Sequence, residues 1–135
     1  MSLDGVLGFL GFGNMGTAIA RGLLATGAAT PDQLSVFDPE PGRQADARSL
    51  GCSVHTDSRE LARNARTLLV AVKPQHWREA CQEPAAAISP GARVISIMAG
   101  VPIRALESVF GGDRAIVRVM PNTPAQRLAG AAALA

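Results

Sequence analysis

A glycine-rich hexapeptide, GFGNMG at residues 11–16, directly follows a short apolar run at residues 6–10. After it, residues 14–26 show apolar side chains at helical spacing, and Gly27 is placed to end that helix. In such a strand–turn–helix unit, Gly11 allows a tight turn, Gly13 lets a ligand approach the backbone, and Gly16 lets helix and strand pack closely. The free N–H groups at the start of the helix favour an anion. The hexapeptide therefore predicts a βα unit that binds phosphate groups.

The rest of the chain repeats this alternation of short apolar runs and helical stretches. The pattern predicts strands at residues 6–10, 34–37, 68–72, 94–98 and 116–120, with helices at residues 14–26, 43–50, 57–65, 75–87 and 102–110. Continuous apolar runs such as residues 68–72 are typical of strands that are buried on both faces. We therefore expect an α/β fold, a Rossmann-like doubly wound and mostly parallel sheet with helices on both faces, and a single domain over residues 1–135.

Composition excludes several other classes of protein. Hydrophobic residues make up 47% of the 135 residues and charged residues 18%, so the chain can build a core. The net charge is +2, its basic residues are scattered, and aromatic residues are 4%, so we expect neither a nucleic-acid nor a membrane partner. Cys52 and Cys81 lie far apart and no His pair has metal spacing, so we expect no metal site and a reducing, cytoplasmic location. The first apolar run lacks the features of a signal peptide.

Polar or backbone-exposing residues follow all of the predicted strands. Because the carboxyl ends of parallel strands lie at one edge of a sheet, we expect these segments to form a ligand site there. Asp38 closes the second strand about 20 residues after the last glycine, which is the position of the acidic residue that accepts a ribose 2′-OH in dinucleotide sites. Asp38 and Glu40 would repel a 2′-phosphate and favour NADH. Arg43 could reach a 2′-phosphate, so NADPH stays possible.

Four segments resemble the pyrroline-5-carboxylate reductases. They are GFLGFGNMG at residues 8–16, AVKPQ at 71–75, SIMAGV at 96–101 and, most specific, VRVMPNTPA at 117–125. The resemblance covers essentially the whole chain but only the amino-terminal domain of that family. It implies reduction of the C=N bond of Δ1-pyrroline-5-carboxylate to L-proline by NAD(P)H. Since a protonated cyclic imine is already electrophilic, this reaction needs neither a strong nucleophile nor a metal.

The same resemblance implies which residues form the site. Asn122 and Thr123 should line the nicotinamide and substrate pocket as the catalytic residues. The implied cofactor-binding residues are Leu10, Gly11, Phe12, Gly13, Asn14, Met15, Asp38, Pro39, Glu40, Ser58, Ala71, Val72, Lys73, Pro74, Met98, Ala99 and Gly100. At Ser58 the chain departs from its relatives, which usually have an Asn that contacts the adenine ribose.

The family's helical carboxy-terminal domain, which dimerises and completes the substrate pocket, has no counterpart in residues 1–135. Full-length members are homo-oligomers, and we expect this chain to be the cofactor-binding fragment of such a protein. Two alternatives remain open. One is a relative among the β-hydroxyacid dehydrogenases and imine reductases, which the MPNTP segment at residues 120–124 disfavours. The other is a dinucleotide-binding module without catalytic activity.

Overall fold

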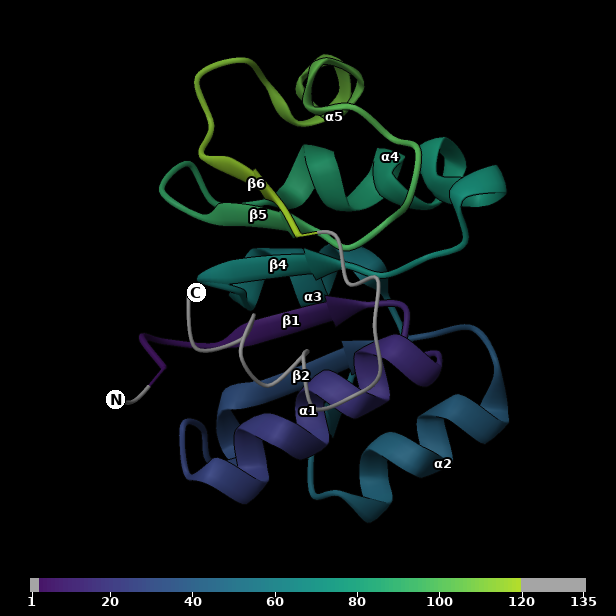
Figure 1. Cartoon of the computed structure of the whole chain (residues 1–135), viewed down its shortest axis with the longest axis vertical. Helices are drawn as coiled ribbons and strands as arrows, with labels where there is room; N and C mark the ends of the chain where they lie inside the picture. Colours follow the sequence, from purple (N-terminus) through teal and green to yellow (C-terminus); the bar gives the residue numbers. More distant parts are fainter. Residues whose placement is uncertain (1–2, 120–135) are drawn as a thin grey trace.

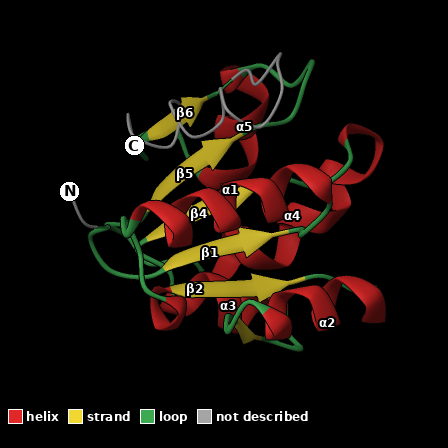
Figure 2. Cartoon of the chain, turned by 60° about the horizontal axis from the view of Figure 1, so that its bottom comes forward, coloured by secondary structure: helices red, strands yellow, loops and turns green. Residues whose placement is uncertain are grey.

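The computed structural model describes residues 3–119. The strands within this range form one six-stranded parallel sheet. Its strands lie in the order β3-β2-β1-β4-β5-β6, and their arrows point the same way in Figure 2. The strands are β1 (Leu7–Leu10), β2 (Leu34–Phe37), β3 (Ser53–Val54), β4 (Thr67–Val70), β5 (Arg93–Ser96) and β6 (Ile116–Arg118). The chain therefore builds outward from β1 in one direction, returns to the centre at β4, and builds outward in the other direction.

Helices cover both faces of this sheet (Figure 1). The α-helices are α1 (Asn14–Thr26), α2 (Pro41–Ser49), α3 (Ser58–Asn64), α4 (Trp77–Ala87) and α5 (Ile103–Phe110). Two short 3₁₀ helices, η1 (Pro31–Gln33) and η2 (Pro74–His76), precede β2 and α4. Helices α1 and α2 pack on one face, whereas α3, α4 and α5 pack on the other. This arrangement confirms the predicted doubly wound α/β class.

The central strands supply both cores because successive side chains point to opposite faces of the sheet. On β4, Leu69 packs in the α1–α2 core, whereas Leu68 and Val70 pack in the α3–α5 core. On β1, Phe9 lies in the first core and Leu10 in the second. This two-sided burial explains why residues 6–10 and 68–72 are continuously apolar.

Local signals set several helix ends as predicted. Gly27 ends α1 with φ +76°, and its N–H donates to the Leu24 carbonyl at 3.3 Å. Asp57 caps α3, since its side chain accepts from the N–H of Arg59 at 2.8 Å. Pro102 is the N-cap residue of α5 rather than a member of its first turn.

Several elements differ from the sequence predictions. Strand β3 was not predicted, because Ser53–Val54 is only two residues long and forms no apolar run. Helix α2 begins at Pro41 rather than at residue 43, since proline suits the first helical position, where no N–H is needed. The strands predicted at residues 68–72 and 94–98 begin one residue earlier, at Thr67 and Arg93, and end two residues earlier, at Val70 and Ser96. The last strand was predicted at residues 116–120, but β6 ends at Arg118; Val119 is not part of a strand, and Met120 lies outside the described residues.

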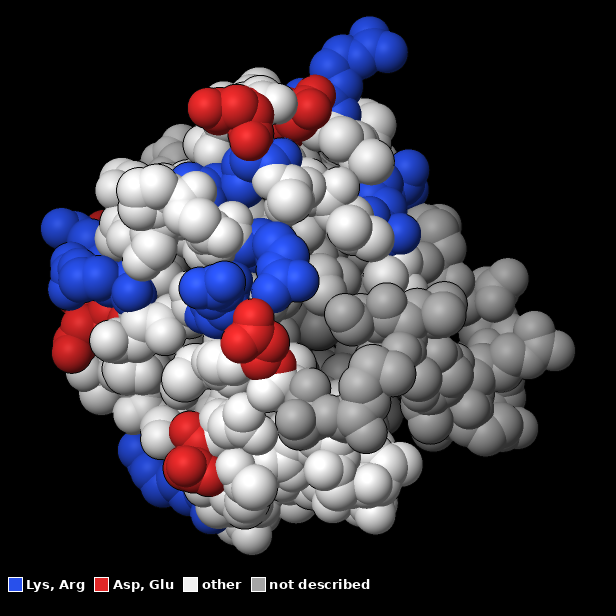
Figure 3. Space-filling model, turned by 90° about the vertical axis from the view of Figure 1, so that its left-hand side faces the viewer, with Lys and Arg blue, Asp and Glu red and all other residues white. Residues whose placement is uncertain are grey.

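Figure 3 views the molecule from the amino ends of the strands, where acidic and basic side chains are interspersed. At this end Asp4 forms ion pairs with Arg66 at 3.8 Å and with Arg93 at 3.6 Å. These side chains are exposed, so each pair stabilises the fold only slightly.

Among residues 3–119, none of the helices has the length and apolar character needed to span a membrane.

The two cysteines are free and buried in different cores. Burial raises the pKa of the Cys52 thiol, and it raises the pKa of the Cys81 thiol from 9.0 to about 12. The folded state holds the Cys81 proton more tightly than the unfolded state does. The contribution of this thiol to the free energy of unfolding is therefore complete below pH 9.0 and is lost as the pH rises toward about 12.

We expect DTNB at about pH 8 to label neither thiol in the native chain and both thiols in denaturant. Rapid labelling of native Cys52→Ala, which retains only Cys81, would contradict this burial.

Candidate functional site

The segments that follow the strands meet at one edge of the sheet, as predicted. Since all the strands are parallel, residues 11–13, 38–40, 71–74 and 97–100 leave β1, β2, β4 and β5 at this edge. Ser58, the first residue of α3, lies near the same edge because β3 ends there, and its side chain is buried. The predicted catalytic residues Asn122 and Thr123 lie outside the described residues. The fold therefore collects all seventeen predicted cofactor-binding residues at this edge.

Gly11 makes the turn out of β1. Its φ of +93° lies in the region that favours glycine, and a Cβ at this position would lie 2.9 Å from the Ala71 carbonyl oxygen. The Gly11 N–H donates to the Phe37 carbonyl at 2.9 Å, and the Ala71 N–H donates to the Leu10 carbonyl at 2.9 Å. The turn is thus tied to the ends of β2 and β4, and the fold itself requires glycine there.

Phe12 anchors the loop in the core. Its fully buried ring packs edge-on against Phe9, with ring centroids 5.5 Å apart. Its N–H donates to Asp38 Oδ2 at 2.8 Å, and its carbonyl accepts from Thr17 Oγ1 at 3.3 Å. By contrast, the Met15 side chain is partly exposed on α1.

Gly13 is the N-cap residue of α1 and differs from Gly11. Its φ of −75° is available to any residue, and a Cβ built on it meets no atom of the described chain within 4 Å. No side chain caps α1, and its first turn holds no acidic residue. The start of α1 therefore presents N–H groups toward open space, as an anion site requires.

Asp38 lies at the end of β2 and is nearly buried, with an exposed fraction of 9%. Both carboxylate oxygens accept main-chain hydrogen bonds: Oδ2 from Phe12 N–H at 2.8 Å and Oδ1 from Glu40 N–H at 2.9 Å. The Gln44 side chain donates to the Asp38 carbonyl at 2.8 Å. The bond to Glu40 is the local turn that aspartate commonly makes two residues ahead.

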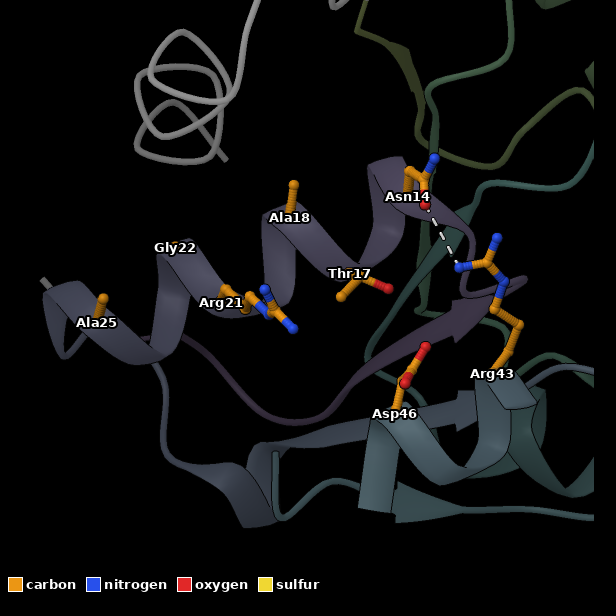
Figure 4. Close-up of a pocket in the computed structure, with 8 residues that line it drawn as sticks. All are labelled: Asn14, Thr17, Ala18, Arg21, Gly22, Ala25, Arg43 and Asp46. Atoms are coloured by element: carbon orange, nitrogen blue, oxygen red, sulfur yellow. Dashed lines mark hydrogen bonds between the residues drawn. The ribbon is translucent and has the colours of Figure 1, made fainter. Parts of the chain in front are cut away.

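A groove of about 620 Å³ lies between α1 and α2 beside this edge, and Figure 4 shows the side chains that line it. At its mouth, Arg43 Nη1 donates to Asn14 Oδ1 at 3.4 Å, and Arg43 Nε lies 3.9 Å from a carboxylate oxygen of exposed Glu40. Thr17 and Arg21 line the groove from α1. The sequence analysis did not predict these two residues as part of a site. Gly13, Thr17 and Arg21 follow one another at four-residue intervals, which places them on one face of α1.

The loops after β4 and β5 form the other half of the edge. Ala71 and Val72 are half-buried, whereas Lys73 and Pro74 are exposed at the start of η2. Met98 is buried in the α3–α5 core, and its N–H donates to Ser96 Oγ at 3.2 Å. Ala99 and Gly100 are exposed, and Gly100 has a φ of +76°. Residues 3–119 contain no group of three or more His, Cys, Asp or Glu side chains that could hold a metal ion.

Comparison with known proteins agrees with the resemblance seen in the motifs. Residues 6–100 match the model of the family described as "NADP oxidoreductase coenzyme F420-dependent". The pyrroline-5-carboxylate reductase of Escherichia coli K12 is 38% identical over 125 residues, which are 92% of this chain and 46% of that protein. The chain spans about half the length of the curated relatives it matches.

Solved structures show the same relationship. A pyrroline-5-carboxylate reductase from Coxiella burnetii superposes with a TM-score of 0.85 at 31% identity, over 93% of this chain and 47% of that chain. The Plasmodium falciparum pyrroline carboxylate reductase, solved with NADP bound, gives a TM-score of 0.80 at 30% identity, over 96% of this chain and 46% of that chain. The predicted Rossmann-like fold is confirmed.

Proposed function

Because the chain belongs to the family described as NADP oxidoreductase, coenzyme F420-dependent, we propose that it is the dinucleotide-binding part of an enzyme that reduces Δ1-pyrroline-5-carboxylate to L-proline with NAD(P)H. The similarity to pyrroline-5-carboxylate reductases over nearly the whole chain supports this substrate. One observation carries the binding proposal: Gly13 has open space where a side chain would stand, at the uncapped start of α1.

The residues present fit a nicotinamide dinucleotide. The N–H groups of the first turn of α1 would hold the pyrophosphate, with Gly13 permitting close approach. Residues 38–40 and Ser58 would border the adenosine end, and residues 71–74 and 98–100 the nicotinamide end, where Asn122 and Thr123 would complete the pocket. When bound, the reduced nicotinamide supplies a hydride. The chain's own contribution is to orient the reactants and to exclude water, since a protonated imine is already electrophilic.

We place the choice between NADH and NADPH at the adenosine end. The negative charge of the exposed Glu40 side chain disfavours a 2′-phosphate and so favours NADH, whose ribose carries no phosphate. Arg43 lies at the mouth of the groove between α1 and α2 and gives a 2′-phosphate a cation, so NADPH binding is also expected. We further propose a cytoplasmic location, which the two free cysteines support.

The purified chain should bind NADH or NADPH yet form little or no proline, since its relatives are about twice as long. Binding is measured by the fluorescence of the reduced nicotinamide, and turnover by loss of its absorbance when pyrroline-5-carboxylate is added. A chimera that carries this chain in place of the amino-terminal part of the E. coli reductase should form proline. A matched chimera with Gly13→Val should not.

The outcomes separate the competing functions. Rapid proline formation by the chain alone would refute the need for a further segment. A chimera that folds and binds dinucleotide but forms no proline would contradict the proposed reaction and favour a non-catalytic dinucleotide-binding module. Turnover of a β-hydroxyacid instead of the imine would assign the chain to the related dehydrogenases.

A further inference from the structure

The carboxylate of Asp38 joins two parts of the candidate site that are far apart in sequence. Its two oxygens accept from the N–H of Phe12, in the glycine-rich loop, and from the N–H of Glu40, the N-cap residue of α2. A single side chain thus holds the turn before α1 and the turn before α2 in one arrangement. We infer that Asp38 is a positioning residue for the glycine-rich loop and not the residue that distinguishes a ribose 2′-hydroxyl from a 2′-phosphate. This inference rests on the proposed dinucleotide site.

Asp38 is only 9% exposed, and its hydrogen bond to Phe12 is itself buried. Hydrogen bonds from N–H groups to a carboxylate are stronger than neutral ones, and a buried N–H that loses its acceptor is costly. The conformation of the loop therefore depends on the Asp38 carboxylate, with or without a ligand.

Phe12 lies directly before Gly13 in the loop. The Phe12 ring packs against Phe9, its N–H donates to Asp38, and its carbonyl accepts from Thr17, so the residue that leads into Gly13 is held on both sides. The first N–H groups of α1 follow from there. A loop that is already in its binding conformation loses less entropy when a ligand binds, and this gain is shared by every ligand that uses the loop.

Both oxygens of the Asp38 carboxylate are directed at main-chain N–H groups, whereas the more accessible charged side chains at the adenosine end are those of Glu40 and Arg43. Glu40 has a side-chain exposure of 73% and Arg43 of 33%. These two residues are the ones placed to distinguish a 2′-hydroxyl from a 2′-phosphate.

The test compares Asp38→Asn with the wild-type chain for three ligands: NADH, NADPH and 2′-deoxy-NADH, which lacks the 2′-OH on the adenosine ribose. Asparagine keeps the shape but replaces one accepting oxygen with an NH₂ donor. We expect all three affinities to fall by a common factor of about tenfold, because the lost bond is in the protein. Asp32→Asn, which makes the same charge change in η1 at the opposite edge, should leave all three unchanged.

Arg114→Met is a control for the effect of destabilisation alone. This arginine donates to the carbonyls of Phe110, Ser89 and Ala92, away from the loop, so its loss should lower the unfolding temperature without changing the three affinities. Hydrogen exchange of the Phe12 amide gives a readout without ligand, and Asp38→Asn should accelerate that exchange.

Two results would overturn the inference. In the first, Asp38→Asn loses affinity for NADH, its affinity for NADPH is unchanged or higher, and its affinity for 2′-deoxy-NADH is unchanged. Asp38 would then be the residue that contacts the ribose 2′-position. The other is unchanged affinity for all three ligands. Failure of the proposed function is distinct: the wild-type chain would then bind none of the three, while faster exchange of the Phe12 amide in Asp38→Asn would still support the positioning role.

Discussion

Replacing Gly13 with valine is expected to weaken binding of both NADH and NADPH by at least about 100-fold while lowering the unfolding temperature by no more than a few degrees, the cost of valine at an N-cap. The reason is the asymmetry at this position. The backbone has a φ of −75°, and an added Cβ meets nothing within 4 Å among the described residues, so the fold tolerates a side chain. A pyrophosphate at the start of α1 would meet that side chain directly. Fluorescence titration and thermal unfolding measure the two quantities.

Gly91→Val is the matched control. Gly91 lies in the turn between α4 and β5, at the edge opposite the site, and it also has open space for a Cβ. We expect wild-type affinity for this variant. Equal affinity of wild type and Gly13→Val would show that the dinucleotide does not lie against this turn, and the proposed site would be wrong.

The second large effect is expected at Gly11, and it concerns stability. A Cβ at Gly11 would be forced into a φ of +93° and would lie 2.9 Å from the Ala71 carbonyl oxygen. Gly11→Ala should therefore lower the free energy of unfolding by about 2–4 kcal/mol, measured by urea denaturation. Gly13→Ala, two residues away, should change it by less than about 1 kcal/mol. A Gly11→Ala variant of wild-type stability would contradict the loop geometry described above.

Most of the fold was predictable because its signals are local. The continuous apolar runs marked the central strands, and Gly27 and Asp57 marked helix ends through backbone conformation and capping. Strand β3 escaped prediction because its two residues pair only once β2 is in place, so its identity depends on a tertiary contact.

The candidate site was predictable in location but not in its connections. The spacing of the glycines and of Asp38 placed these residues at one edge, and the parallel sheet brings them there. The bond from Phe12 to Asp38 joins residues 26 positions apart, so no local pattern indicates it. Similarly, Arg21 faces the groove only because α2 packs beside α1, which the sequence of α1 does not encode by itself.

The division of the core by the sheet affects how the two ends of the site can vary. Phe12, beside the proposed adenosine end, lies in the core under α1, whereas Met98, beside the proposed nicotinamide end, lies in the core under α3–α5. A change of side-chain volume in one core is transmitted mainly to the loop that rests on it. If a dinucleotide binds at the proposed site, its affinity and the alignment of its reactive ring can therefore be adjusted separately, by repacking opposite sides of the same sheet.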